Sequence, residues 1–183
     1  MSASGRPGFE PVTRFDDAVD KYFDDHLRGR PELDRLMYSA SAAADHSAIW
    51  LVLAALQGWR SGPGWRPLLR AGALLGGESV LVNGLVKLVF RRQRPETTGP
   101  RPLHLRIPIT SSFPSGHSSA AFFAATLLSD GPSGIVYFAL AALIASSRVY
   151  VKVHHASDVV AGAALGATLG AVAKRVVPLQ PRD

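Results

Sequence analysis

Cysteine is absent from this 183-residue chain. Disulfide bonds, thiolate catalysis and zinc or iron–sulfur sites built on cysteine are therefore excluded. Long apolar runs are also scarce, because only residues 71–90 reach the roughly 20 apolar positions that a membrane-spanning helix requires. The first residues show no apolar core followed by a small-residue cleavage site, and we therefore expect no signal peptide.

Positive charge is present in excess. The chain has 20 Lys and Arg residues against 14 Asp and Glu residues, which gives a net charge of +6 and an isoelectric point near 10.2. This balance suits a nucleic-acid, an anionic-lipid or a phosphate partner. The basic residues form no dense stripe with interleaved aromatic residues, and we therefore expect no nucleic-acid partner.

Hydrophobic residues make up 47% of the chain and are concentrated in blocks after residue 45. The blocks are residues 47–59, 71–90, 118–128, 135–147 and 159–173. Most are shorter than a span, which keeps a soluble helical bundle open as an alternative, although flanking residues can lengthen each helix. Gly162, Gly166 and Gly170 share one helical face, a spacing that lets membrane helices approach closely. We predict an all-α, multi-pass transmembrane helical bundle with about five spanning helices.

The first 45 residues are highly charged and differ from the rest of the chain. From Thr13 the apolar residues follow helical spacing, and Pro31 suits the first turn of a second helix. Both amphipathic helices could lie at a membrane interface or pack on the bundle. We therefore divide the chain into an N-terminal tail with amphipathic helices (1–45), a membrane-embedded core (46–177) and a short C-terminal tail (178–183).

Basic residues gather where the second apolar block ends. Lys87 and Arg94 are seven residues apart, nearly two helical turns, so a continuing helix would place both cations on one face. Pro95 disfavours helix at the residue before it, which predicts that Arg94 lies at the helix end. Snorkelling of a cation towards the membrane surface is the alternative explanation.

A Pro-Ser-Gly-His sequence opens the third apolar block. Pro114 and Ser115 before an apolar run predict a helix N-terminus, whose free N–H groups and dipole favour an anion such as phosphate. Gly116 permits close backbone approach, and the His117 imidazole can protonate a leaving oxygen. An ordinary capped turn with a solvated histidine is the alternative.

The third cluster lies between the last two apolar blocks. His154 and Asp158 are four residues apart, so on one helix the carboxylate can hold one imidazole nitrogen and leave the other free. This arrangement orients a base or a nucleophile. Arg148 can bind the same phosphate with its fork of donors. The alternative is an ion pair at a helix end.

Each cluster lies at the end of an apolar helix, and helices of alternating direction bring all three to the same side of the membrane. Three cations, two histidines and one carboxylate then converge, which is the inventory of a metal-independent phosphoryl-transfer site. The residues that could instead ligate a metal are His117, His154, His155 and Asp158. The neighbouring Lys87, Arg94 and Arg148 would repel a cation, so we predict neither a metal nor another cofactor.

Together the clusters resemble the three signature motifs of the type 2 phosphatidic acid phosphatase superfamily in order, spacing and residue identity. The motifs are Lys87-x6-Arg94-Pro95, Pro114-Ser115-Gly116-His117 and Ser147-Arg148-x5-His154-x3-Asp158. They span residues 87–158, with apolar helices on either side. The resemblance implies a helical bundle whose core holds phosphate or, in related soluble haloperoxidases, vanadate.

The resemblance also implies a role for each matching residue. His154 would attack phosphorus and form a phosphohistidine, Asp158 would orient it, and His117 would protonate the leaving group. The residues implied to bind the phosphoryl oxygens are Lys87, Arg94, Ser115, Gly116 and Arg148. The family spacing selects His154 over its neighbour His155 as the nucleophile. This chain departs from larger members in having about five apolar blocks instead of six, preceded by amphipathic segments.

We therefore expect an integral-membrane enzyme that hydrolyses a phosphate monoester or pyrophosphate of a phospholipid or polyprenyl lipid. The substrates considered are phosphatidate, phosphatidylglycerophosphate, undecaprenyl pyrophosphate and a decaprenyl phosphoribose phosphate, and the motifs do not select among them. A vanadium haloperoxidase-like enzyme shares the motifs but is soluble and usually longer. A non-catalytic membrane lipid-binding protein would be expected to lack His154 or Asp158, and both are present.

We place the enzyme in the cell membrane and leave homo-oligomerisation open. With five spans, the side of the site carries 14 Lys and Arg residues against six, or 11 against six without the three phosphate-binding cations, which favours a cytoplasmic site. Glu78 and Asn83 are polar residues inside the longest apolar block. Asn83 lies one turn before Lys87 and is predicted to hold its ammonium group, with helix–helix hydrogen bonding as the alternative.

Overall fold

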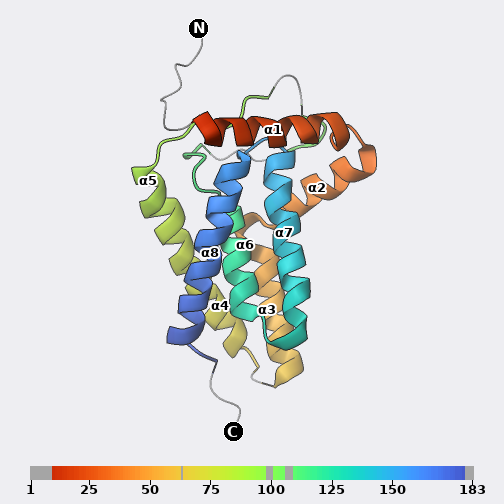
Figure 1. The fold of residues 1–183 in the computed structure, drawn as a ribbon. Coiled ribbons are helices and arrows are strands. Elements are labelled where there is room, and N and C mark those ends of the chain that lie inside the picture. The colour runs from red at the N-terminus through yellow and green to blue at the C-terminus, as the bar shows by residue number, and fades with distance from the viewer. Residues whose placement is uncertain (1–9, 63, 98–100, 106–108, 180–183) are drawn as a thin grey trace.

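The computed structural model describes residues 10–62, 64–97, 101–105 and 109–179 (Figure 1). Across this part of the chain the secondary structure is helical and no strand occurs, in agreement with the all-α prediction. The longer helices are α1 (Glu10–His26), α2 (Pro31–Ala43), α3 (Ala48–Ser61), α4 (Arg66–Ser79), α6 (Gly116–Leu128), α7 (Gly134–Tyr150) and α8 (Ala156–Val176). The shorter segments are η2 (Asp45–Ser47), η3 (Val80–Val86), α5 (Lys87–Val89) and η4 (Gly131–Ser133).

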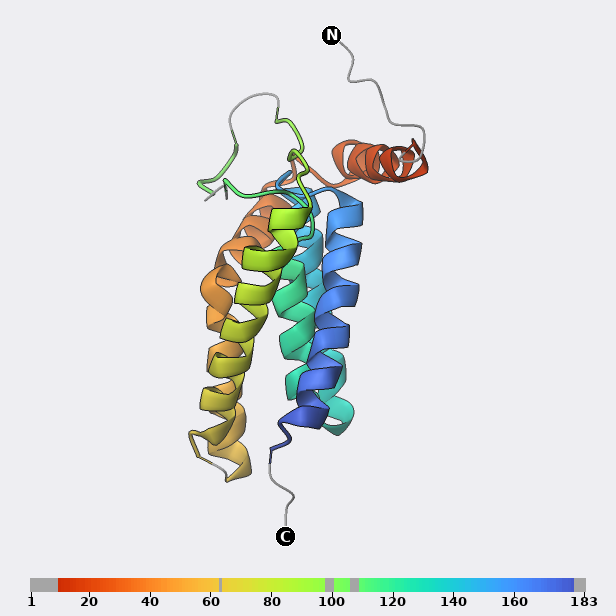
Figure 2. The same ribbon diagram turned by 90° about the vertical axis from the view of Figure 1, so that its left-hand side faces the viewer.

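Helices α3 to α8 form a bundle with roughly aligned axes, and α1 lies across one end of it (Figures 1 and 2). The α2–α3 and α4–α5 segments form one side of the bundle, and α6, α7 and α8 form the other (Figure 2). Helix α6 is central and apolar around most of its circumference. Its Ala121, Ala124 and Ala125 are at most 1% exposed, as expected of a helix enclosed by its neighbours.

Helices α6 and α8 are in direct backbone contact along the predicted glycine face. A Cβ atom at Gly162 would lie 2.4 Å from the Ser115 carbonyl oxygen, and one at Gly166 would lie 2.0 Å from that of Ser119. At Gly170 the distance to the Phe123 carbonyl oxygen would be 2.8 Å. No side chain fits at these separations without moving main chain, so the predicted close approach is confirmed. The contact places the first turn of α8 beside the first turn of α6.

Fewer helices are long enough to span a membrane than the sequence predicted. Among the described residues, Arg66–Val89 and Ala156–Val176 have the required length and apolarity. A third span results only if Pro31–Ala43 and Asp45–Arg60, bent by 66°, are counted as one. Gly134–Tyr150 is apolar but shorter, and the 13 residues of α6 reach only about 20 Å. By length and composition the described residues therefore give two spans, or three with the bent pair, against the expected number of about five.

Both N-terminal helices form, α2 starting at Pro31 as predicted and α1 starting at Glu10, three residues before the predicted Thr13. They pack on the bundle, one of the two placements that the sequence left open. Phe23 contacts two apolar clusters at the end of the bundle, one around Tyr150 and one around Val159. The amphipathic segments therefore cover the ends of α7 and α8.

The chain changes helix type just before the first motif. Val80–Val86 is a π-helix, and the following α5 ends at Val89, five residues before Arg94. The prediction that Arg94 lies at the helix end is therefore wrong. The chain leaves the helix because it pairs with a later segment: the Ser112 N–H donates to the Arg92 carbonyl at 2.9 Å. Arg94 is consequently held in an irregular segment above the bundle end.

Candidate active site

The three predicted clusters meet at the end of the bundle that α1 crosses. Lys87 comes from α5, Gly116 and His117 from the start of α6, and His154 from the turn between α7 and α8. These four residues line one cavity of about 360 Å³. The alternation of helix direction thus brings the clusters together as the sequence predicted.

His154 is placed by a turn and not by a helix. The Arg148 carbonyl accepts hydrogen bonds from the N–H groups of Val153 and His154, each at 3.2 Å, while Lys152 adopts a positive φ of 51°. Helix α8 begins only at Ala156. The predicted shared helical face of His154 and Asp158 is therefore incorrect, although their contact forms.

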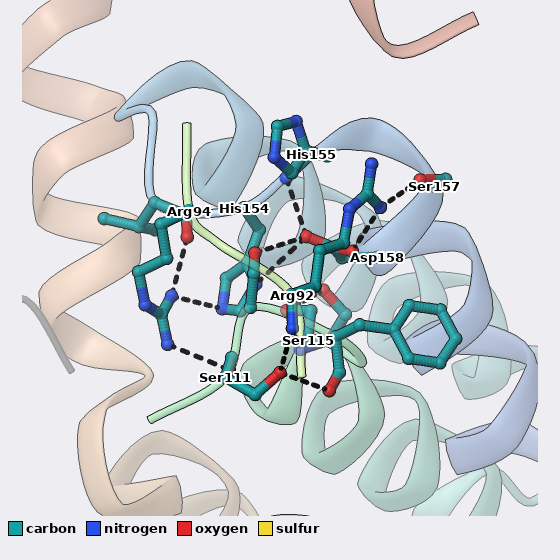
Figure 3. Close-up of polar contacts among 12 residues, drawn as sticks. Arg92, Arg94, Ser111, Ser115, His154, His155, Ser157 and Asp158 are labelled. Carbon is teal, nitrogen blue, oxygen red and sulfur yellow. Dashed lines mark hydrogen bonds and ion pairs between the residues drawn. The ribbon is translucent and has the colours of Figure 1, made fainter. Parts of the chain in front are cut away.

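Asp158 is fully buried in the first turn of α8 and accepts several hydrogen bonds. Its Oδ2 lies 3.7 Å from His154 Nδ1, 2.5 Å from Ser112 Oγ and 2.9 Å from the His155 N–H (Figure 3). Its Oδ1 accepts from Arg92 Nη1 at 2.6 Å. Ser112 Oγ also lies 3.5 Å from His154 Nδ1, so this hydroxyl helps to link the carboxylate to the imidazole.

The other nitrogen of His154 faces Arg94. His154 Nε2 lies 3.3 Å from Arg94 Nη1, which also donates to the Val153 carbonyl at 2.6 Å (Figure 3). A guanidinium only donates, so Nε2 presents its lone pair. His154 is 2% exposed and lies outside the helices long enough to span a membrane. Burial lowers the pKa of His154 to about 3, assisted by the charges of Arg94 and Arg148 and opposed by Asp158, so the imidazole is neutral at ordinary pH.

The basic residues keep unused donors at this site. Arg148 is 1% exposed, and its Nη1 donates to Ser41 Oγ. Its Nε and Nη2, together with Arg94 Nε, are buried without a hydrogen-bond partner in the described part of the chain. Buried guanidinium donors are normally satisfied, and a phosphoryl oxygen is a strong acceptor for them. The arrangement therefore suits an oxyanion.

The Pro-Ser-Gly-His sequence forms the predicted helix start. Ser115 is the N-cap of α6, and its Oγ accepts from the Ser118 N–H at 3.3 Å. A Cβ at Gly116 would lie 2.4 Å from the Asn83 side-chain oxygen, so this position is closely packed. Asn83 donates to Ser79 Oγ at 3.2 Å, and the predicted contact with the Lys87 ammonium is not formed.

His117 pairs with a carboxylate that the sequence did not predict. Its Nε2 donates to Asp45 Oδ1 at 2.8 Å. His155, in contrast, is the N-cap of α8, and its Nε2 lies 3.3 Å from the Gln93 carbonyl. His155 therefore faces away from the cavity that His117 and His154 line.

The sequence profile of the PAP2 superfamily matches residues 67–182 of this chain. The chain belongs to the PAP2 superfamily. Its match includes all three motifs and the helices that carry them.

Relatives of this chain include lipid phosphatases. The decaprenylphosphoryl-5-phosphoribose phosphatase of Mycobacterium tuberculosis (strain ATCC 25618 / H37Rv) is 33% identical over 151 residues, which cover 82% of this chain and 84% of the relative. The lipid A 1-phosphatase of Rhizobium johnstonii is 36% identical over 96 residues, 49% of this chain and 39% of that protein. The prediction of a membrane lipid phosphatase is thus confirmed at the level of family and class.

Two solved PAP2 structures share the fold. The transmembrane PAP2-type phosphatidylglycerolphosphate phosphatase of Bacillus subtilis superposes with a TM-score of 0.71 at 25% identity, covering 94% of this chain and 89% of that chain. LpxE of Aquifex aeolicus gives a TM-score of 0.67 at 26% identity, covering 86% and 93%. The membrane helical-bundle architecture is therefore that of PAP2 membrane phosphatases.

Sequence reasoning missed several residues that support the PAP2 motifs. Ser112 stands two residues before Pro114, and a hydroxyl so close to a motif was a usable signal. Arg92 lies inside the first motif, at one of the positions for which the motif specifies no residue. Asp45 lies 72 residues before His117 and outside any motif, so no local pattern could have found it.

Proposed function

We propose that this chain is an integral-membrane phosphatase that hydrolyses a phosphate monoester or pyrophosphate of a lipid through a phosphohistidine on His154. The observation that carries the proposal is the environment of His154: a neutral imidazole with Asp158 at Nδ1 and with Nε2 directed at Arg94. Unused guanidinium donors of Arg94 and Arg148 adjoin it. A candidate nucleophile, a group that can orient it and donors for an oxyanion thus lie together.

In the first step, the lone pair of His154 Nε2 attacks phosphorus while Lys87, Arg94 and Arg148 hold the phosphoryl oxygens. The bond from phosphorus to the leaving oxygen breaks, and its electron pair stays on that oxygen. His117 supplies the proton that completes the leaving group. The positive charge that develops on His154 is met by Asp158, whose Oδ2 is 3.7 Å from Nδ1.

In the second step, water replaces His154 at phosphorus. Neutral His117 accepts a proton from the attacking water, and the bond from phosphorus to Nε2 breaks with its electron pair returning to nitrogen. Phosphate leaves, and both histidines regain their starting forms. The phosphoryl-binding role that we assign to Ser115 and Gly116 fits their place at the N-terminus of α6.

Lys and Arg supply the charge stabilisation that a metal supplies in other phosphatases, so we propose a metal-independent reaction. Three cations aimed at the transferring oxygens stabilise the transition state without reorganisation. Within the described residues, no group of three His, Asp or Glu side chains is arranged to hold a metal ion.

The lipid is proposed to approach beside the end of α5. A second hollow of about 720 Å³ adjoins Lys87 and Arg94 and includes Leu88 and Ile109 among its lining residues. Both of these side chains are exposed. An apolar chain could lie along them while its phosphate reaches the cations.

We propose a polyprenyl-linked sugar phosphate as the first substrate to test, because the M. tuberculosis relative named for one matches 82% of the chain. A multi-pass topology with the site at the cytoplasmic face is proposed from the excess of Lys and Arg on that side. The residue counts on the two sides assume five crossings, more than the two or three spans that length and apolarity give, and a topology map with residue-specific labels checks this assumption.

The test is a phosphate-release assay on the purified protein in detergent. The panel contains decaprenylphosphoryl-5-phosphoribose, phosphatidylglycerophosphate, phosphatidate and undecaprenyl pyrophosphate, with His154→Ala as the matched inactive control. We expect release from at least one lipid and none above background from His154→Ala. Equal rates for both proteins, or release from none of the lipids, would contradict the proposed function.

A further inference from the structure

Asp45 and His117 form a second carboxylate–imidazole pair, separate from that of His154 and Asp158. The Oδ1 of Asp45 lies 2.8 Å from Nε2 of His117. An ionised carboxylate only accepts hydrogen bonds, so Nε2 must carry a hydrogen. The nitrogen left to exchange a proton with a ligand is therefore Nδ1 of His117.

The backbone places Asp45 for this contact. Asp45 begins η2, at the break where the α2 and α3 segments bend by 66°. The next two residues, His46 and Ser47, have φ angles of 54° and 58°, a left-handed conformation that L-residues rarely adopt. Strained backbone of this kind gathers at functional sites. Here it directs Asp45 into the cavity that also contains His117 and His154.

Several charged groups around His117 act on its pKa, and Asp45 acts in the direction opposite to the cations. Burial lowers the pKa of His117, as do the charges of Arg148 from α7 and Lys87 from α5, whereas the hydrogen bond and the charge of Asp45 raise it. Glu78 of α4 lines the same cavity but accepts from Ser119 Oγ at 2.5 Å. His46 and His154 are the remaining titratable groups lining the cavity.

Asp158 and Asp45 differ in the groups that their carboxylates contact. Asp158 forms an ion pair with Arg92 at 2.6 Å and accepts hydrogen bonds from Ser112 and the His155 N–H, in addition to facing His154. The Asp45 carboxylate accepts from His117 Nε2, and this hydrogen bond is the main cause that lowers the pKa of Asp45. A general acid must be protonated while the nucleophile is neutral, and Asp45 is the group beside His117 that favours its protonation.

We propose that Asp45 is a positioning residue for the acid step: it orients His117 and favours the protonated imidazole that delivers a proton to the leaving lipid oxygen. This inference rests on the proposed function. As the bond from phosphorus to oxygen breaks, the proton on Nδ1 of His117 passes to that oxygen, and His117 becomes neutral with Nε2–H still donating to Asp45. A proton from the attacking water returns to Nδ1 in the second step.

The kinetic test compares Asp45→Asn and Asp45→Glu with the wild type on a lipid phosphate and on 4-nitrophenyl phosphate, whose leaving group needs no proton. For Asp45→Asn we expect kcat on the lipid to fall about 100-fold, the scale of general acid catalysis, with little change in KM. The aryl phosphate should be hydrolysed at nearly the wild-type rate. The alkaline limb of the lipid pH profile should move to lower pH, and Asp45→Glu should restore part of the rate.

The Asp45–His117 pair can also be tested without substrate, by measuring the protonation of His117. Histidine-selective ¹⁵N spectra in detergent, with His117 assigned through His117→Asn, give the midpoint of its protonation. We expect this midpoint to fall by about one pH unit in Asp45→Asn. Asp25→Asn, which removes an exposed carboxylate bonded to Lys21, is the matched control and should leave the spectra and both rates unchanged.

Three results would overturn the inference: an unchanged His117 midpoint, an equal loss on both substrates, or a lower KM with unchanged kcat. The last would show that Asp45 competes with phosphate for His117. A wild-type protein that releases no phosphate from any lipid would instead overturn the proposed function and the kinetic role with it, whereas the midpoint reports on the Asp45–His117 pair in either case.

Discussion

Asp16 accepts two hydrogen bonds from Ser157, one from its backbone N–H at 2.7 Å and one from its hydroxyl at 2.8 Å. Ser157 lies in the first turn of α8, next to the Asp158 that we propose orients the nucleophile. Arg92 joins the two carboxylates, donating to Asp16 and to Asp158 at 2.6 Å each. Helix α1 is therefore tied to the proposed active site by a buried polar network.

We expect Asp16→Ala to lower both stability and kcat. The change leaves the Arg92 guanidinium and the Ser157 N–H without their buried acceptor, which costs about 1–3 kcal/mol. Arg92 is then free to shift relative to Asp158. Thermal unfolding in detergent and phosphate release measure the two effects. Asp17→Ala, which alters the exposed neighbour, is the control, and similar losses in both variants would contradict a role for the network.

The choice between the adjacent histidines can be tested by trapping the covalent intermediate. His154→Ala should abolish phosphohistidine and reduce turnover by several orders of magnitude, about the scale of a lost covalent catalyst. His155→Ala should retain substantial activity, because His155 caps α8 and its Nε2 contacts the Gln93 carbonyl. Mass spectrometry after rapid quenching locates the phosphate. Its recovery on His155 would refute the assignment.

Asp158→Asn should impair turnover severely without unfolding the protein. The amide keeps the shape of the side chain but can no longer balance the positive charge that develops on His154 during attack. Substrate affinity should change little, since the Asp158 carboxylate bonds to Arg92, Ser112 and the His155 N–H and not to the proposed phosphoryl-binding cations. Single-turnover rates together with a binding measurement separate the two quantities, and a variant with wild-type kcat would exclude the orienting role.

Activity should persist in excess chelator and be inhibited by vanadate. Both expectations follow from the use of Lys87, Arg94 and Arg148 to stabilise a pentacoordinate phosphoryl group. Phosphate release with and without EDTA is the measurement, followed by a vanadate titration. Loss of activity in chelator that magnesium restores would defeat the metal-independent mechanism.

Gly166→Ala should destabilise the bundle. The new Cβ would lie 2.0 Å from the Ser119 carbonyl oxygen, so α6 and α8 must separate, at a cost of roughly 1–3 kcal/mol. Gly76→Ala is the control, because a Cβ there meets nothing within 4 Å and alanine favours helix. Thermal unfolding of both variants in detergent is the measurement. A wild-type melting temperature for Gly166→Ala would contradict the close packing.

The sequence was most informative where chemistry and local geometry coincide. The motif residues Lys87, His117 and His154 could be brought together because each marks the end of an apolar helix. The glycine spacing predicted the close approach of α6 and α8 correctly. A helix face without side chains lets a neighbouring backbone come close wherever the helix lies.

Relations that depend on the path of the main chain were not predictable. His154 and Asp158 meet across a turn instead of along a helix, since the Arg148 carbonyl holds that turn. Arg94 reaches Nε2 of His154 from an extended segment that pairs with residues 111–112, far along the chain. Asp45 depends on two left-handed residues for which no glycine gave a signal.

The backbone contact of α6 with α8 has a consequence for how such an enzyme can diversify. The separation between His117 and Asp158 is determined by carbonyl oxygens resting on Gly162 and Gly166, and not by side chains that adopt alternative rotamers. Substitutions of exposed residues such as Leu88 and Ile109, which line the hollow proposed for the lipid, can therefore reshape the surface that meets the substrate while the distance between the reacting groups is conserved. New substrate preferences are accessible by mutation there, whereas the inner pair of helices tolerates almost no change at its glycines.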